Sequence, residues 1–305
     1  MFTNRSILQY FVIAILTILA GCQTQPAGQS SGKIRRIVSL SPNITEIIYA
    51  LGQQDKLVGV TDFCKYPPQA TKKRHIGGFV NPNIETIVSL KPDVLIGLPS
   101  HADLAQKLQN EHLKFVLLPD DRLADVFFTI DSLGRLLGCE TKARHVIKAI
   151  QDSLRYYRRQ SLAVQRFSPK TMLVIGRDPG STTHITVVGP HTFIDSVWTL
   201  MGGKNIFADL PVKYAQVNRE NILLKQPDLI IEFHFGEQWN AHKDSLNRRS
   251  WQSFAGVPAV KNGQIYVLTG TYTLIPGPRI YKLAADFSHI IQHFFQNKKS
   301  RAAQK

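Results

Sequence analysis

The sequence has only three cysteines among its 305 residues, which excludes a small scaffold held together by disulfides. Charged residues are also scarce, at 19% against 43% hydrophobic residues, so a disordered or collagen-like chain is excluded. Acids are the scarcer sign, because 22 Asp and Glu face 37 Lys and Arg. The resulting formal charge of +15 points to an acidic partner or an anionic surface. The length fits one large domain or two ordinary ones.

Familiar catalytic motifs are missing as well. The sequence contains no glycine-rich dinucleotide or phosphate loop, no G-x-S-x-G, no H-E-x-x-H and no C-x-x-C. These absences disfavour a nucleotide-dependent enzyme. Cys64 has no His or acid tied to it by a known pattern, so we assign no catalytic residue and expect no enzyme.

No metal site is predicted. Asp286, His289 and His293 share one face of the last expected helix. That face lies opposite an apolar stripe and has no further ligand nearby, so a solvated face is favoured over a metal site.

The first residues have the pattern of an export signal. One basic side chain, Arg5, precedes an apolar run over residues 11–21, which is about half of the ~20 residues that a membrane-spanning helix needs. The run ends in Leu-Ala-Gly-Cys22, which looks like a lipobox. We therefore predict a lipoprotein signal peptide over 1–21 and a lipidated tether over 22–33 that begins at Cys22. The alternative is an ordinary signal peptide with an incidental cysteine.

Export decides how the positive charge is interpreted. Nucleic acid is disfavoured as a partner, and no run of basic residues interleaved with aromatic residues supports it. The basic clusters are expected to be solvated faces near anionic lipid or cell-wall polymer; they are Arg155, Arg158, Arg159 and, in the tail 298–305, Lys298, Lys299 and Arg301. Cys64 and Cys139 could pair in an oxidising compartment or remain buried free thiols.

The rest of the chain alternates short apolar runs with amphipathic segments. This rhythm predicts an α/β fold with parallel sheets wrapped in helices. Strands are expected at 37–40, 57–60, 94–97, 115–118, 172–175, 229–233 and 265–268. A helix with apolar residues at Ile44, Ile47, Ile48 and Leu51 is expected to start at Pro42 and to end at Gly52.

An internal repeat divides this body into two lobes. Glu85 and Glu220 each stand seven residues before a Pro-Asp pair that ends a helix and begins a strand. Residues 140–166 contain no Gly or Pro and predict one long rigid helix of about 40 Å between the lobes. The predicted lobes are therefore 34–139 and 167–297, both Rossmann-like.

Candidate binding residues follow the expected strands. Ligands of open α/β sheets bind outside the carboxyl ends of strands, and two lobes can combine both ends into one cleft. Aromatic rings there could stack on a flat, largely apolar ligand, and Arg177 or Arg279 could fix an anionic group. For His234, a buried structural histidine and a ligand to iron or cobalt are both open. The candidates are Phe63, Tyr66, Phe79, Arg177, Tyr214, His234, Tyr272 and Arg279, with His101 and Trp239 beside them.

Five segments resemble one known family. Residues 36–46, 60–68, 77–85, 91–93 and 216–220 look like the periplasmic-binding family for vitamin B12 and ferric siderophores. The resemblance covers about residues 34–295. It implies a lipid-anchored or periplasmic protein, expected to be monomeric, with two lobes joined by a single rigid helix. Such a protein delivers its ligand to the permease and ATPase complex of an ABC importer.

The same resemblance assigns roles to single residues. In the B12 binders one glutamate at the tip of each lobe pairs with permease arginines, and those positions match Glu85 and Glu220. The aromatic residues that contact the corrin ring fall on Phe63, Phe79, Tyr214 and Tyr272, while a further pocket aromatic falls on Leu98, which is aliphatic here.

The resemblance also bears on the ligand. It implies cobalamin or a related corrinoid, with no covalent cofactor. A ferric siderophore or haem is the alternative ligand. A free metal-ion receptor and, last, a hydrolase are the alternatives of another class.

Overall fold

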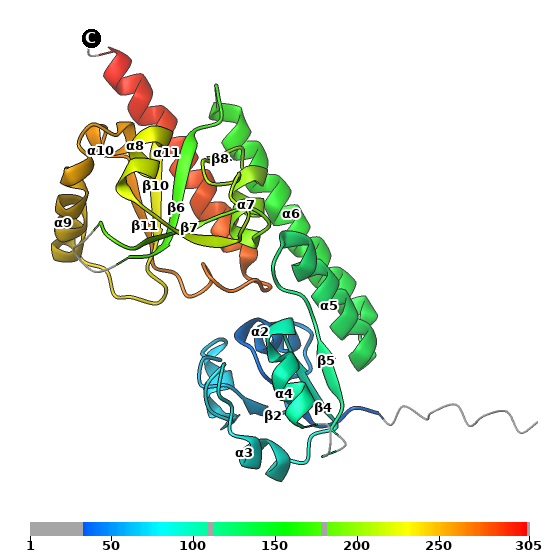
Figure 1. Cartoon of the computed structure of the whole chain (residues 1–305). Helices are drawn as coiled ribbons and strands as arrows, with labels where there is room; N and C mark the ends of the chain where they lie inside the picture. Colours follow the sequence, from blue (N-terminus) through cyan, green and yellow to red (C-terminus); the bar gives the residue numbers. More distant parts are fainter. Residues whose placement is uncertain (1–32, 109–110, 112, 178–181, 304–305) are drawn as a thin grey trace, which may run out of the picture. The chain divides into compact units, whose positions relative to one another are not determined.

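The computed structural model describes residues 33–108, 111, 113–177 and 182–303. The predicted signal peptide, Cys22 and the tether up to residue 32 lie outside the described residues. Residues Arg35–Lys305 form one compact unit (Figure 1). No helix in the described ranges has the length and apolar character to cross a bilayer.

The first sheet is parallel throughout. Its strand order is β3-β2-β1-β4-β5, and every neighbouring pair runs parallel. We call the part built on this sheet the first lobe. Its strands are β1 (Ile37–Ser39), β2 (Leu57–Val60), β3 (Arg74–His75), β4 (Val94–Gly97) and β5 (Phe115–Leu117). Its α-helices are α2 (Pro42–Ala50), α3 (Ile84–Ser89), α4 (Ala102–Lys107) and α5 (Leu123–Leu137), with short 3-10 turns at Gln54–Lys56, Pro68–Lys72 and Pro99–His101.

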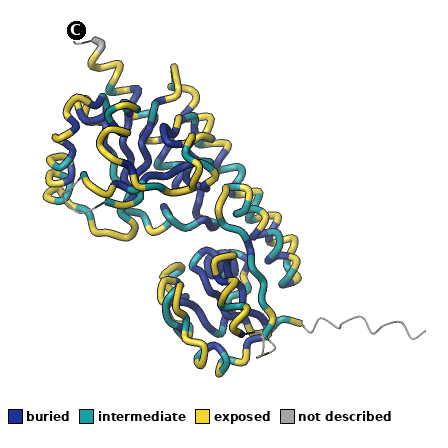
Figure 2. The backbone as a smooth tube through the Cα atoms, viewed as in Figure 1, coloured by how far each residue is buried: buried dark blue, intermediate teal, exposed yellow. Residues whose placement is uncertain are grey.

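Local sequence explains where these helices begin and end. Pro42 opens α2, as predicted, because a first-turn proline loses no helical hydrogen bond. Asn83 caps α3 by accepting a hydrogen bond from the Thr86 amide at 2.7 Å. Gly138 ends α5 at φ 67°, a left-handed conformation that glycine adopts without a Cβ clash. The strands β1 and β4 are fully buried, as near-continuous apolar runs in a parallel sheet should be (Figure 2).

The second sheet is mixed, which differs from the prediction of a parallel sheet. Its order is β11-β10-β6-β7-β9, and β8 also pairs with β6. β10 and β8 run parallel to β6, and β11 runs parallel to β10, but β7 is antiparallel to both β6 and β9. Only residues 177–184 join β6 to β7, which is too short for the crossover helix that a parallel pair needs.

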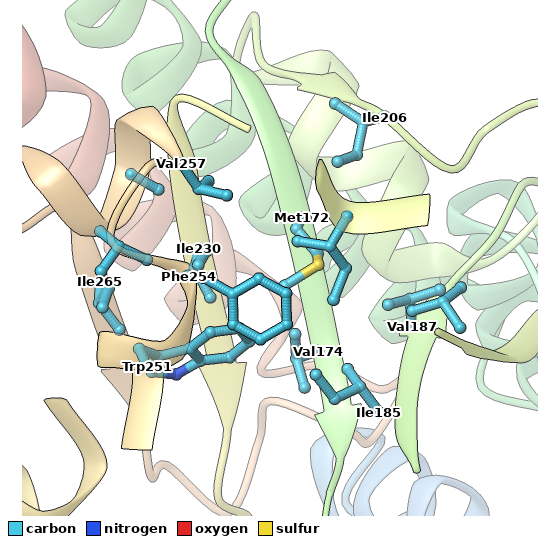
Figure 3. Close-up of a cluster of buried hydrophobic side chains, with 14 of the residues drawn as sticks. Met172, Val174, Ile185, Val187, Ile206, Ile230, Trp251, Phe254, Val257 and Ile265 are labelled. Carbon is cyan, nitrogen blue, oxygen red and sulfur yellow. The ribbon is translucent and has the colours of Figure 1, made fainter. Parts of the chain in front are cut away.

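We call the part built on the second sheet the second lobe. Its strands are β6 (Lys170–Gly176), β7 (Ile185–Val188), β8 (Lys204–Asn205), β9 (Tyr214–Val217), β10 (Leu229–Phe233) and β11 (Ile265–Leu268). Its helices are α7 (Phe193–Leu200), α8 (Arg219–Lys225), α9 (Ala241–Ser250), α10 (Pro258–Lys261) and α11 (Ile280–Ala303), with a 3-10 turn at Trp251–Phe254. Met172, Val174, Ile230, Trp251 and Phe254 belong to one buried cluster on this sheet (Figure 3).

One long helix connects the two lobes. α6 (Glu140–Val164) has 25 residues and ends two residues before the predicted boundary. Gln165 turns to extended backbone there and donates its side-chain amide to the Met201 carbonyl at 3.2 Å. α6 packs against α5 of the first lobe and also against α11 of the second lobe. The helix is therefore held by both lobes.

The predicted repeat is visible in atomic detail. Lys91 and Gln226 both adopt a left-handed φ, of 44° and 46°, and each precedes a Pro-Asp pair. Asp93 accepts the Arg36 amide at 2.8 Å at the start of β1, and Asp228 accepts the Lys170 amide at 3.0 Å at the start of β6. Each aspartate thus satisfies a backbone donor where the first strand of its lobe begins.

Candidate functional site

Loops of the first lobe, together with Phe235 and residues 274–276, line a cavity of about 670 Å³. We call it the apolar hollow because aromatic and aliphatic side chains dominate its wall. Phe63 is 58% exposed and Val80 is more exposed still, which is unusual for large apolar side chains unless a partner covers them. Its lining residues are Ser41, Pro42, Asn43, Phe63, Gly78, Phe79, Val80, Asn81, Leu98, Asp120, Phe235, Leu274, Ile275 and Pro276.

Each strand of the first sheet contributes to this wall. Ser41 follows β1, Phe63 follows β2, Phe79 follows β3, Leu98 follows β4 and Asp120 follows β5. Because all five strands are parallel, their carboxyl ends meet at one edge of the sheet. The topology thus brings together residues that lie up to about 80 positions apart.

A buried histidine holds two of these loops in place. His101 accepts the Leu98 amide at 3.0 Å through Nδ1, and its Nε2 lies 3.3 Å from the Phe79 carbonyl. Its ring also meets the Phe79 ring edge-on, at 4.6 Å between centroids. Burial lowers the pKa of His101, which favours the neutral ring that can accept from one loop and donate to the other. His101 positions Phe79.

The second lobe provides a charged cavity of about 570 Å³. We call it the charged hollow. Arg177 follows β6 and His234 follows β10, while Lys243 and Asn247 come from α9. Its lining residues are Val174, Ile175, Gly176, Arg177, Glu232, Phe233, His234, Phe235, Glu237, Trp239, Lys243, Leu246, Asn247 and Leu274.

Glu232 organises the polar groups of the charged hollow. This side chain is 1% exposed and accepts hydrogen bonds from Arg177 Nε at 2.7 Å, Asn247 Nδ2 at 2.7 Å and Trp251 Nε1 at 2.8 Å. Burial acts to raise the pKa of Glu232, but hydrogen bonds from His234 and Arg177 and the Arg177 charge outweigh it and bring the pKa to about 2. Glu232 was not predicted as a site residue, although an acid inside the apolar strand Leu229–Phe233 was a usable signal.

His234 and Trp239 form the rim of the charged hollow. Their rings lie 4.5 Å apart, and His234 Nδ1 lies 3.1 Å from Glu237. Glu237 also accepts from Lys243 Nζ at 3.3 Å. The hydrogen bond to Glu232 raises the pKa of His234 and outweighs the effect of burial. The charged side chains described on this wall therefore occur in opposite-sign pairs.

The two hollows share part of their walls. Phe235, from the second lobe, and Leu274 line both. Ile275 and Pro276 continue this wall along the apolar hollow. The predicted cleft between the lobes is present, with an apolar first-lobe side and a polar second-lobe side. It brings together Phe63, Phe79, Arg177 and His234 from the predicted set.

Arg279 joins the two lobes instead of facing a hollow. It is 6% exposed and donates to both oxygens of Glu46 on α2, at 2.8 Å from Nε and 2.5 Å from Nη2. Its guanidinium also lies 3.9 Å from the ring centre of Tyr66 and donates to Thr271. Tyr272 donates to Asp286 at 2.7 Å, and burial together with this hydrogen bond raises the pKa of Tyr272. The predicted ligand-binding residues Tyr66, Tyr272 and Arg279 are therefore absent from the described lining of both hollows.

Tyr214 opens β9 and therefore does not follow a strand as predicted. Burial and the carboxylates of Asp120 and Asp121 raise the pKa of Tyr214 to about 12. The neighbouring Lys213 forms an ion pair with Asp121 of the first lobe. Tyr214 thus lies near the loop after β5 rather than in the described lining of either hollow.

Glu85 and Glu220 occupy equivalent places in the two lobes. Each is exposed in the first turn of a short helix, α3 or α8, two residues after an asparagine cap. Acids in a first turn stabilise the helix dipole, and these two also remain available to an outside partner.

The cysteines and the histidines of α11 form no disulfide and no metal site among the described residues. Cys64 and Cys139 are both free, and only Cys64 is buried. His289 and His293 are exposed, opposite the buried stripe of Leu283, Phe287 and Ile290. Within the described ranges, no group of three or more His, Cys, Asp or Glu residues could hold a metal ion.

One known protein family matches most of the described chain. The family model described as periplasmic binding protein matches residues 37–272, which span both sheets. The chain belongs to the periplasmic binding protein family. Members of this family work outside the cytoplasm with the permease and ATPase of ABC transporters.

Relatives within the periplasmic binding protein family are similar over most of the chain. The vitamin B12-binding protein of Vibrio cholerae is 31% identical over 253 residues, which cover 80% of this chain and 84% of that protein. A Bacillus subtilis protein named as an uncharacterized ABC transporter substrate-binding lipoprotein is 28% identical over 81% of this chain and 76% of its own. The crystal structure of the periplasmic vitamin B12 binding protein BtuF of Vibrio cholerae superposes with a TM-score of 0.72 at 27% identity, over 86% of this chain and 98% of that one.

Proposed function

We propose that this protein is the substrate-binding component of an ABC importer and captures cobalamin or a related corrinoid. The observation that carries the proposal is a cleft lined by an exposed aromatic side chain from each lobe, Phe63 from the first and Phe235 from the second. Flat, apolar ligand faces stack on such rings. The role is binding and release, without catalysis.

The polar wall favours a corrinoid over haem. Arg177 is paired with Glu232, and Lys243 with Glu237, so this wall offers donors and acceptors in balance. The primary amides around a corrin ring both donate and accept, which suits such a wall. The two carboxylates of haem would need cations whose charge is not already neutralised.

Calorimetry with several ligands tests the proposal. We use a chain that starts at Gln23, because the compact unit Arg35–Lys305 contains both sheets. Cyanocobalamin and cobinamide should bind with a Kd between about 1 nM and 1 μM. Haem and a ferric hydroxamate siderophore should bind more weakly. Tight binding of haem or siderophore alone would assign the alternative ligand, and no binding of any class would overturn the ligand proposal.

A pair of variants links the binding to the cleft. Phe63→Ala should weaken corrinoid binding by about tenfold, because it removes one stacking contact. Phe128→Ala is the matched control, since Phe128 is 56% exposed on α5 and does not line either hollow among the described residues. Equal losses in both variants would contradict the placement.

We further propose that the protein is anchored through Cys22. The support is the lipobox, together with the similarity to a protein named as a lipoprotein. Cys22→Ser should abolish incorporation of labelled fatty acid and should move the protein from the membrane fraction to the soluble fraction. Labelling that persists in the variant would reject the anchor.

A further inference from the structure

A third concave surface lies where α6 ends beside the last turns of α11, and it shares no described lining residue with either hollow. Its volume is about 670 Å³, and its described lining comes from residues 163–167 and from α11. We call it the basic groove. Its lining residues are Ala163, Val164, Gln165, Arg166, Phe167, Gln292, Phe295, Gln296, Lys298 and Lys299.

The groove carries positive charge that no acid neutralises. Arg166, Lys298 and Lys299 line it, and none of its described lining residues is acidic. The ion pairs found in the described part of the chain include none of these three cations. The sequence after Asp286 contains no further acid. Arg158 and Arg159, near the end of α6, are exposed as well but do not belong to the described lining of the groove.

Apolar side chains are exposed beside these cations. Phe167 is 40% exposed and Val164 is 37% exposed, and both line the groove. The ring of Phe167 packs edge-on against the ring of Phe295, with 5.2 Å between the ring centres. Lys298 Nζ lies 4.2 Å from the centre of the Phe167 ring. The end of α11 is exposed in Figure 2.

The end of α11 is fixed to the second lobe. Arg301 donates to the carbonyl and the side-chain oxygen of Asn262, at 2.7 and 2.6 Å. These bonds hold Lys298 and Lys299 in a defined place at the groove. Basic residues often stabilise the last turn of a helix, but that effect does not explain the exposed Phe167 and Val164 in the same groove.

We propose that the basic groove binds the anionic phospholipid surface of a bilayer. Cations near exposed aromatic and aliphatic side chains fit the boundary between charged headgroups and acyl chains. Arg and Lys would pair with lipid phosphates while Phe167 enters the interface. This surface is separate from the ligand cleft, so it does not depend on which ligand the cleft holds.

Vesicle co-sedimentation tests the proposal with the chain that starts at Gln23. The protein should bind vesicles of phosphatidylcholine mixed with phosphatidylglycerol, and should not bind phosphatidylcholine alone. Each lysine near an anionic surface contributes about fivefold, so the double variant K298Q/K299Q should bind about 25-fold more weakly. K298R/K299R should bind like the parent. Added salt should weaken the parent's binding, because it screens the attraction.

A matched variant controls for net charge. Lys72 and Lys107 are exposed on the first lobe, so K72Q/K107Q removes the same charge elsewhere. An equal loss in K72Q/K107Q, or equal binding to both kinds of vesicle, would overturn the proposal. Binding to a soluble glycerol-phosphate polymer without binding to vesicles would overturn it in favour of a cell-wall partner. Corrinoid calorimetry on K298Q/K299Q should match the parent, which separates this outcome from a failure of the cleft.

Discussion

Asp120 places a carboxyl group on the wall of the apolar hollow. Burial, together with repulsion from Asp121, raises its pKa from 3.8 to about 6, although Lys213 counteracts part of this. Asp125 adds further negative charge on the same side. Asp120 therefore changes its charge within the pH range in which ligand binding is measured.

Ligand affinity should increase as the pH falls toward about 6, the pKa of Asp120 in the free protein, and should level off below it. A ligand in the apolar hollow removes more water from Asp120, which favours the neutral acid and makes binding take up a proton. Calorimetry at several pH values on either side of about 6 checks this. Asp120→Asn should remove the dependence near that pH, because an amide does not titrate. A pH profile that is the same in parent and variant would show that another group, such as His234, is responsible.

Sequence patterns could identify which loops meet, but not what each side chain does there. Phe63 and Phe79 were predicted because they follow strands, and they line the apolar hollow. Arg279 follows the same logic, yet its guanidinium is engaged by Glu46, which lies 233 positions away. Pairing across such a distance depends on the packing of the lobes, which a single sequence does not reveal.

At the scale of elements, the bond between Glu46 of α2 and Arg279, which precedes α11, joins the lobes directly. Glu46→Gln should destabilise the protein by about 3–5 kcal/mol, because it leaves the buried Arg279 cation without its counter-charge. Urea unfolding measures this loss. The double variant Glu46→Leu with Arg279→Met should recover most of it, since it removes both buried charges. A double variant as unstable as Glu46→Gln would show that the pair itself, and not the unpaired charge, sets the loss.

Strand positions were the most predictable feature. The expected strands at 57–60, 94–97, 229–233 and 265–268 coincide with β2, β4, β10 and β11, because buried parallel strands are short apolar runs. β7 and β9 were missed since Ile185–Val188 and Tyr214–Val217 lack a long apolar run, and β3 and β8 have two residues each. Strand direction in the second sheet depends on the short connection before β7, which apolar periodicity does not encode.

At the scale of the whole molecule, we predict that Glu85 and Glu220 contact the permease. The double variant Glu85→Ala with Glu220→Ala should keep its corrinoid affinity, since both side chains are exposed and outside the described lining of the hollows. Its association with the permease should slow and lose salt dependence, because rim charges act mainly on encounter. Surface plasmon resonance against the reconstituted permease measures both. Reduced corrinoid binding would instead place these acids in the ligand site.

The place of Trp239 beside His234 on the wall of the charged hollow has a practical consequence. The chain has three tryptophans, and Trp198 and Trp251 are fully buried in the second lobe. Of the three tryptophans, only Trp239 belongs to the described lining of a hollow, so its fluorescence reports directly on the cleft. A coloured ligand that absorbs near tryptophan emission would quench it by energy transfer. Ligand arrival can therefore be followed in real time without attaching any dye.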